Sequence, residues 1–151
     1  MENPGRTFRE LLTTEPYLFT GGVYDPLGAQ IAERAGIKSV YLSGYSMAMA
    51  NGWPDMGFLT QTEVTRIASM VASAVSIPII ADADNGYGNA LSTIRTVQEY
   101  VKTGVAGIHL EDQVFPKRCG HIAGKTIVPF ETALGKYRAA IDTRNRLDRD
   151  F

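Results

Sequence analysis

Carboxylates follow two short apolar runs of the sequence and could together bind a metal ion. Asp82 and Asp84 come after Ile77–Ala81, and Glu111 comes directly after Ala106–Leu110. Aspartate and glutamate oxygens are hard ligands that suit a partly hydrated Mg²⁺. The same acids could instead cap the following helices or pair with lysine and arginine. Three of them at neighbouring strand ends favour a metal site, because unpaired buried charge is costly.

The most specific feature is the segment Lys117-Arg118-Cys119-Gly120-His121. Two cations beside a cysteine favour its thiolate, and a neighbouring histidine can relay the proton. The same cations can hold a substrate carboxylate. The alternative is a solvated basic turn with an incidental cysteine, but the whole segment so soon after Leu-Glu-Asp-Gln is uncommon.

Alternating strands and helices must position these groups. Runs of β-prone residues predict strands at 17–20, 37–42, 77–81 and 106–110. Helical spacing and capping signals predict helices at 7–12, from 26 to a glycine cap at 36, from 61 to 74, from 91 to 101 with a glycine cap at 104, and from 129 to about 144. Asp25 is typical of an N-cap, and Thr60 with Glu63 fits a capping box. A long loop is expected between Leu42 and Leu59.

Strands that alternate with helices predict an α/β fold of parallel β-α units with right-handed crossovers. Four units fit half of a (β/α)₈ barrel or a small open doubly wound sheet. Residues two apart on a strand share a face. Each of three predicted strands therefore ends in two polar side chains on one face: Tyr41 and Ser43, Asp82 and Asp84, His109 and Glu111. Chemistry at strand ends is typical of a barrel, so we predict its first four β-α units.

Composition excludes several classes of partner. The 151 residues include fifteen basic and sixteen acidic ones, for a formal net charge of −1, so we expect neither nucleic acid nor an anionic membrane as partner. No apolar run reaches the roughly 18 residues that span a bilayer. The N-terminus lacks a secretory pattern, and the single cysteine cannot form an internal disulfide. We therefore expect a cytoplasmic protein.

Five ordered segments resemble the isocitrate lyase and phosphoenolpyruvate mutase family. The segment 117–121 resembles the signature of isocitrate and methylisocitrate lyases, and residues 82–88 resemble the Asp-x-Asp-x-Gly-[Tyr/Phe]-Gly segment of the superfamily. Tyr41-Leu-Ser-Gly, Pro54-Asp55 and Glu111-Asp-Gln match three more segments in the right order. The resemblance runs from about Phe19 to the end of the chain.

The resemblance implies a (β/α)₈ barrel enzyme that uses Mg²⁺, with Mn²⁺ as a substitute, to hold a 2-oxo or 2-hydroxy acid. It implies a metal shell, acting partly through water, of Asp82, Asp84 and Glu111. It implies substrate contacts at Ser43, Gly44, Tyr45, Asp55 and Gly120. Residues 117–121 then form a mobile gating loop, with Lys117, Arg118, Cys119 and His121 as catalytic residues.

The resemblance also implies a reaction. A carbon–carbon lyase of this type cleaves isocitrate or 2-methylisocitrate to succinate plus glyoxylate or pyruvate. Cys119 then protonates the departing fragment, and Tyr41 is a possible base. Tyr41 could equally be an aromatic that packs the barrel, and we expect His109 to pack there rather than to contact substrate.

The chain departs from the family pattern in length and in one segment. It provides about four of eight β-α units, so we expect residues 1–151 to form a single domain, the N-terminal half of a barrel, and the whole protein to form a homodimer or homotetramer. Gly44-Tyr45-Ser46-Met47 matches neither lyase type. The alternatives are a 2,3-dimethylmalate lyase, an oxaloacetate decarboxylase, a phosphoenolpyruvate or carboxyphosphoenolpyruvate mutase, or a non-catalytic partner.

Overall fold

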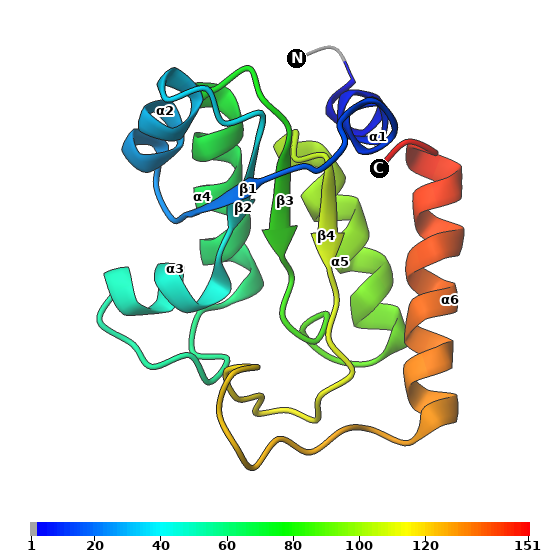
Figure 1. The fold of residues 1–151 in the computed structure, drawn as a ribbon. Helices are drawn as coiled ribbons and strands as arrows, with labels where there is room; N and C mark the ends of the chain where they lie inside the picture. The colour runs from blue at the N-terminus through cyan, green and yellow to red at the C-terminus, as the bar shows by residue number, and fades with distance from the viewer. Residues whose placement is uncertain (1–2) are drawn as a thin grey trace.

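A sheet of four parallel strands forms the centre of the protein (Figure 1). A computed structural model describes residues 3–151. The strands lie side by side in chain order: β1 (Thr20–Val23), β2 (Ser39–Leu42), β3 (Ile79–Asp82) and β4 (Gly107–His109). Tyr41 pairs with Ile80, and Asp82 pairs with His109. Tyr41, Asp82 and His109 therefore lie on one face of the sheet.

Four helices pack in chain order along the other face: α2 (Pro26–Arg34), α4 (Gln61–Ala74), α5 (Ala90–Thr103) and α6 (Phe130–Leu147). Each helix contacts the next one in this series. Because the strands also follow chain order, all three crossovers run over the same face. A doubly wound sheet needs helices on both faces, so this arrangement supports the predicted barrel-type fold. No helix within residues 3–151 is long and apolar enough to cross a membrane.

The helix-facing side chains of β2 and β3 build the core. Val40, Leu42, Ile79 and Ala81 are at most 2% exposed and pack with Val71 of α4 and its neighbours. Burying one aliphatic side chain of valine or leucine size stabilises a fold by about 1.5–3 kcal/mol. This packing fixes the strands, and the strands in turn fix the backbone positions of the polar residues at their carboxyl ends.

Three predicted helix-capping signals are confirmed. Asp25 caps α2, because its Oδ1 accepts a 2.7 Å hydrogen bond from Gly28 N. Thr60 and Glu63 form the predicted capping box at the start of α4. Gly104 ends α5 in the left-handed conformation, at a φ of 84°. These signals are local in sequence, and no tertiary contact overrides them.

Two predicted elements differ from the structure. The first strand lies at Thr20–Val23 rather than 17–20, because pairing with β2 selects the small residues Gly21 and Gly22, and leaves Tyr17 80% exposed. The expected long loop after β2 contains a helix, α3 (Gly44–Ala50), held by the buried Met47. In addition, α6 and the first helix, α1 (Pro4–Thr14), are longer than predicted.

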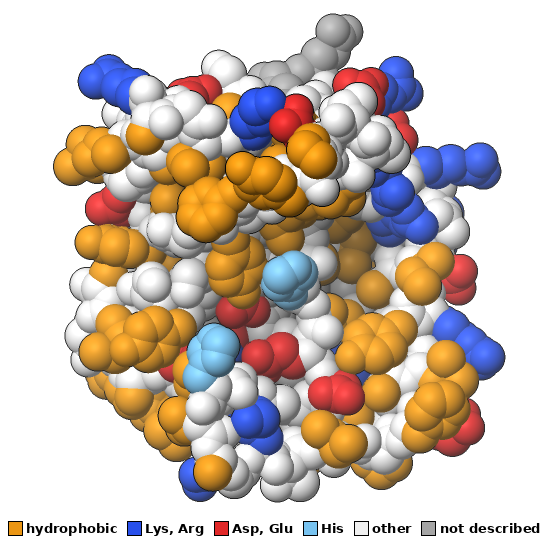
Figure 2. Space-filling model, in the orientation of Figure 1, with side chains coloured by type: hydrophobic (Ala, Val, Ile, Leu, Met, Phe, Trp, Pro, Cys, Tyr) orange, Lys and Arg blue, Asp and Glu red, His pale blue; other side chains and the backbone are white. Residues whose placement is uncertain are grey.

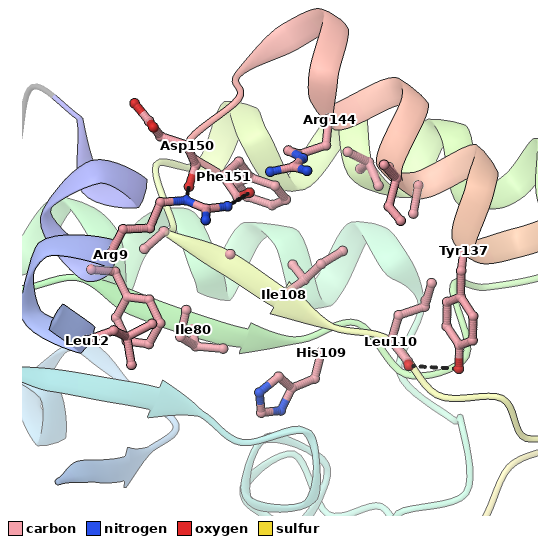
Figure 3. A pocket seen from close by; sticks show the side chains of 16 residues that line it. Arg9, Leu12, Ile80, Ile108, His109, Leu110, Tyr137, Arg144, Asp150 and Phe151 are labelled. Atoms are coloured by element: carbon pink, nitrogen blue, oxygen red, sulfur yellow. Dashed lines mark hydrogen bonds between the residues drawn. The ribbon is translucent and has the colours of Figure 1, made fainter. Parts of the chain in front are cut away.

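The free edge of β4 borders a groove of about 570 Å³ between α1 and α6 (Figure 3). Its walls are mainly apolar and include Leu12, Ile108 and Ile141. Arg9 closes one end by donating a 2.8 Å hydrogen bond to the backbone carbonyl of Asp150. A free parallel edge beside apolar walls is a surface on which a further β-α unit can pack.

Replacing the N-cap residue of α2 tests how much this local hydrogen bond contributes to the stability of the fold. Asp25→Ala leaves Gly28 N without its acceptor and should lower the free energy of unfolding by about 1 kcal/mol. Equilibrium urea denaturation measures the loss. Glu10→Ala, an exposed acid inside α1, is the control and should change stability by less than about 0.5 kcal/mol. Equal losses in both variants would contradict the assigned cap.

Candidate active site

A buried lysine is the centre of the candidate site. The Lys117 side chain is 2% exposed, and its Nζ lies 2.7 Å from Asp55 Oδ1 and 2.8 Å from Asp84 Oδ1. Glu111 Oε1 lies 3.9 Å from the same nitrogen. The three acids come from the loop before α4, from the end of β3 and from the end of β4. Figure 2 shows acidic side chains gathered in a hollow between the two histidines.

Burial and charge act in opposite directions on this cluster. Desolvation raises the pKa of Asp84 and of Glu111, and the nearby Lys117 offsets part of that rise. Burial alone would lower the pKa of Lys117, but Asp84 and Asp55 outweigh it and raise this pKa. Lys117 therefore stays an ammonium ion. The carboxylates outnumber it, so the site still favours a further positive charge.

Gln113 fastens the segment that carries Lys117. Its side chain donates to Glu111 Oε2 at 3.0 Å and to the backbone carbonyl of Arg118 at 2.8 Å. It also accepts a 3.0 Å hydrogen bond from Arg118 N. Sequence analysis placed Gln113 in a family segment but gave it no role. The available signal was an amide side chain two residues after Glu111, because buried amides are usually hydrogen-bonded.

Asp82 and Gly44 approach each other closely. Asp82 is 9% exposed at the end of β3 and accepts a 2.9 Å hydrogen bond from Asp84 N. A methyl group at position 44 would overlap the Asp82 carboxylate. Gly44 is therefore required for close packing against this acid. Its role in substrate binding stays a prediction.

Two other predicted substrate contacts lie at the start of α3. The Ser43 hydroxyl caps this helix by accepting a 3.2 Å hydrogen bond from Ser46 N. Tyr45, in the first turn, is 50% exposed. Ser43 thus already has a local structural use, and Tyr45 is accessible to solvent; the substrate contacts of both stay predictions.

Tyr41 and His109 pack against each other on the open face of the sheet. Their ring centroids are 5.1 Å apart and tilted by 34°. Burial, followed by the charge of Asp82, raises the pKa of the Tyr41 phenol, and Lys117 partly lowers it. The phenol is therefore protonated near neutral pH. His109 makes the expected packing contact, although its own side chain is exposed.

The remaining residues of the gating segment lie outside the acidic cluster. Arg118, Gly120 and His121 are exposed, and Cys119 is half-buried. Because Lys117 points inward, the turn that follows it stands at the rim of the hollow. The structure therefore separates an inward anchor from outward reactive groups. The catalytic roles of these outward residues stay predictions.

The predicted metal ligands suit Mg²⁺ by their chemistry. Asp82, Asp84 and Glu111 offer carboxylate oxygens only, and desolvation raises the pKa of two of them, so a cation would relieve their burial. Within residues 3–151, however, no three acidic, histidine or cysteine side chains converge closely enough to hold an ion directly. Ligation partly through water, as predicted, requires no such convergence.

Sequence reasoning missed the supports of the loop 82–88. Asp84 and Tyr87 adopt left-handed φ values of 47° and 57°, which cost on the order of 1 kcal/mol each. Tyr100 of α5 donates a 2.7 Å hydrogen bond to the backbone carbonyl of Asp82. Its hydroxyl also lies 3.1 Å from the Tyr87 hydroxyl. A tyrosine on a predicted helix was the available signal, but it does not reveal its target.

Comparison with known proteins now identifies the family. A family model described as phosphoenolpyruvate phosphomutase matches residues 8–151. The chain belongs to the phosphoenolpyruvate mutase family. This membership confirms the resemblance seen in the sequence and the barrel-type fold.

Among curated relatives, the 2,3-dimethylmalate lyase of Eubacterium barkeri is 46% identical over 94% of this chain and 50% of its own length. The isocitrate lyase of Haloferax volcanii is 44% identical over 95% of this chain and 42% of its own length. The solved phosphoenolpyruvate phosphomutase of Streptomyces platensis subsp. rosaceus has a TM-score of 0.92 at 36% identity, covering 97% of this chain and 51% of that one.

A solved phosphonopyruvate hydrolase in complex with oxalate and Mg²⁺ has a TM-score of 0.87 at 32% identity, covering 99% of this chain and 50% of that one. The chain therefore spans about half the length of the relatives it matches. Lyases, mutases and hydrolases are all similar to it, so the comparisons show the family and leave both the reaction and the substrate to be proposed.

Removing the buried ammonium tests the electrostatic account of the site. Lys117→Met leaves Asp55 and Asp84 buried without their partner, which should lower the free energy of unfolding by about 3 kcal/mol. Urea denaturation in EDTA measures this loss without a compensating cation. Lys102→Met removes an exposed pair with Glu99 and should cost less than about 1 kcal/mol. Similar costs for both lysines would refute the assigned role of Lys117.

Proposed function

We propose that the protein carrying this chain is a Mg²⁺-dependent carbon–carbon lyase that cleaves isocitrate or 2-methylisocitrate to succinate plus glyoxylate or pyruvate. One observation carries the proposal. Lys117 is buried among carboxylates of three segments, and Cys119 follows it by two residues. The proposed proton donor is thereby tied to the proposed metal site.

Asp82, Asp84 and Glu111 would hold the cation, some of them through water, with Mn²⁺ as a substitute. A bound Mg²⁺ would orient the 2-oxo or 2-hydroxy acid end of the substrate and offset its negative charge. The donor set supports this assignment, because only oxygen ligands are offered and two of the acids have raised pKa values. Lys117 and its partner Asp55 hold the gating segment beside these acids.

The rim of the hollow supplies the proposed substrate contacts. Arg118 presents an exposed guanidinium group, which suits a carboxylate of the substrate. We assign Ser43, Gly44 and Tyr45 to the wall formed by α3, and Gly120 to the turn that closes over the substrate. A dicarboxylate or tricarboxylate fits this arrangement, because the proposed cation would bind one carboxylate and Arg118 another.

Two proton transfers complete the proposed reaction. Tyr41 takes the proton of the 2-hydroxyl group, the carbon–carbon bond then breaks as in a retro-aldol reaction, and a 2-oxo acid forms. Burial and Asp82 raise the pKa of the phenol even with Lys117 nearby, so Tyr41 must first give up its own proton before it can act as this base. Cys119 gives its proton to the carbanion of the departing fragment, and His121 relays a proton back to Cys119.

A second candidate keeps the site and changes the reaction. The relative with 46% identity is a 2,3-dimethylmalate lyase, and this similarity favours a substituted malate as the second substrate class. The decarboxylation of oxaloacetate is a further superfamily reaction, as are the reactions of phosphoenolpyruvate mutase and carboxyphosphoenolpyruvate mutase. The cysteine-containing segment favours the lyases, because a carbanion product needs a proton donor.

The sheet has two free edges, at β1 and β4, and the β4 edge borders an apolar groove. Further β-α units packed on these edges would complete both the barrel and the substrate pocket. We propose that the complete protein is a cytoplasmic homodimer or homotetramer whose partner is a small carboxylate, with no nucleic acid or membrane partner.

A product assay on the native polypeptide tests the proposal. With Mg²⁺ present, incubation with isocitrate or 2-methylisocitrate should release glyoxylate or pyruvate together with succinate, and EDTA should abolish the release. Oxaloacetate, 2,3-dimethylmalate and phosphonopyruvate are assayed in parallel for carbon dioxide, propionate plus pyruvate, and phosphate products. Turnover of one of these alone would replace the proposed substrate, and no turnover of any would favour a non-catalytic partner.

Removing the thiol tests the proposed proton donor. Cys119→Ser should lower kcat by about 100-fold or more, because serine is a much weaker acid in this step. Mg²⁺ and product binding should stay within about threefold of the wild type, since Cys119 lies outside the acidic cluster. Ala123→Ser adds a hydroxyl to the same exposed turn and should leave kcat unchanged. Near-normal turnover of Cys119→Ser would refute the assignment.

A further inference from the structure

A buried lysine outside the active-site hollow has no role in the proposed reaction. Lys136 lies in the second turn of α6 and is 3% exposed. Its Nζ donates a short hydrogen bond to the backbone carbonyl of Asn85. Among the described residues, no carboxylate lies within ion-pair distance of this amine. The Lys136 amine is therefore buried against one backbone carbonyl oxygen, that of Asn85.

The target of Lys136 is the loop that carries the proposed metal ligands. Asn85 directly follows Asp84, whose φ of 47° is in the left-handed region. The carbonyl of Asp84 accepts a 2.8 Å hydrogen bond from Glu111 N. With Lys136 on the next carbonyl, the two peptide groups on either side of Asn85 are both held from outside the loop.

Two more carbonyls of this loop accept hydrogen bonds from side chains of α5. Tyr100 donates to the carbonyl of Asp82, and Thr96 Oγ1 lies 3.0 Å from the carbonyl of Gly86. Helices α5 and α6 pack against each other. Side-chain donors of two outer helices thus hold the loop, and among the described residues Lys136 is the α6 side chain that hydrogen-bonds to it.

We propose that Lys136 is a positioning residue, which holds Asp84 in its left-handed conformation and so directs the Asp84 carboxylate toward the metal site and Lys117. This inference rests on the proposed metal-dependent function. Lys136 does not contact the substrate or the cation. It acts through the Asn85 carbonyl, and its loss would let the peptide groups around Asp84 rotate.

Metal binding provides a readout that a purely structural lysine would not change. Mn²⁺ is titrated into the native full-length polypeptide, with and without oxalate, and free Mn²⁺ is followed by electron paramagnetic resonance. Lys136→Met keeps the apolar length of the side chain and removes the donor, so Mn²⁺ affinity should fall at least tenfold. The KM for Mg²⁺ should rise in proportion. Arg138→Met, on the exposed side of α6, should bind Mn²⁺ as the wild type does.

Lys136→Arg makes the test independent of whether the methionine variant folds. It keeps a cationic donor but displaces it, so it should fold, as checked by circular dichroism, and should bind Mn²⁺ about threefold more weakly than the wild type. Wild-type affinity in a folded Lys136→Met variant, or in Lys136→Arg if the methionine variant does not fold, would overturn the positioning role alone. Absence of Mn²⁺ binding in the wild type would overturn this inference together with the proposed function.

Discussion

The buried ammonium group of Lys117 is the interaction on which the site depends. It joins Asp55, Asp84 and Glu111, which belong to three segments far apart in the sequence. In a poorly solvated site none of these charges is tolerated alone. The ion pairs therefore fix both the strand-end loops and the start of the gating segment, while the excess of carboxylates keeps the hollow attractive to a cation.

Because of this constraint, the segment 117–121 has a buried, fixed start and a more exposed remainder. Lys117 is directed inward and Gln113 holds the next peptide group, so the segment cannot move as a whole without breaking buried bonds. Arg118, Cys119 and His121 stand beyond these anchors at the rim. In the proposed reaction, the carboxylates of a substrate would draw these outer residues inward, while the proposed metal ligands would stay in place at the strand ends.

The sequence predicts those parts whose signals are local. Asp25, Thr60 and Gly104 mark helix ends through contacts within four residues. That Tyr41 and Asp82 share one face follows instead from the register of β2 against β3. The inward direction of Lys117 could not be predicted, because it depends on acids from other segments. The shift of β1 depends on pairing with β2, and α3 depends on burial of Met47. The roles of Tyr100 and Lys136 likewise exist only through tertiary contacts with the loop 82–88.

Location of the cation tests the central claim most directly. Crystals of the native full-length protein are soaked with Mn²⁺ and oxalate, and anomalous differences locate the metal. The account predicts one strong peak bounded by Asp82, Asp84 and Glu111, directly or through waters, with oxalate bound to the ion and Lys117 still paired with Asp55. A peak elsewhere, or none beside these three acids at saturating Mn²⁺, would contradict the proposed metal site and the lyase chemistry built on it.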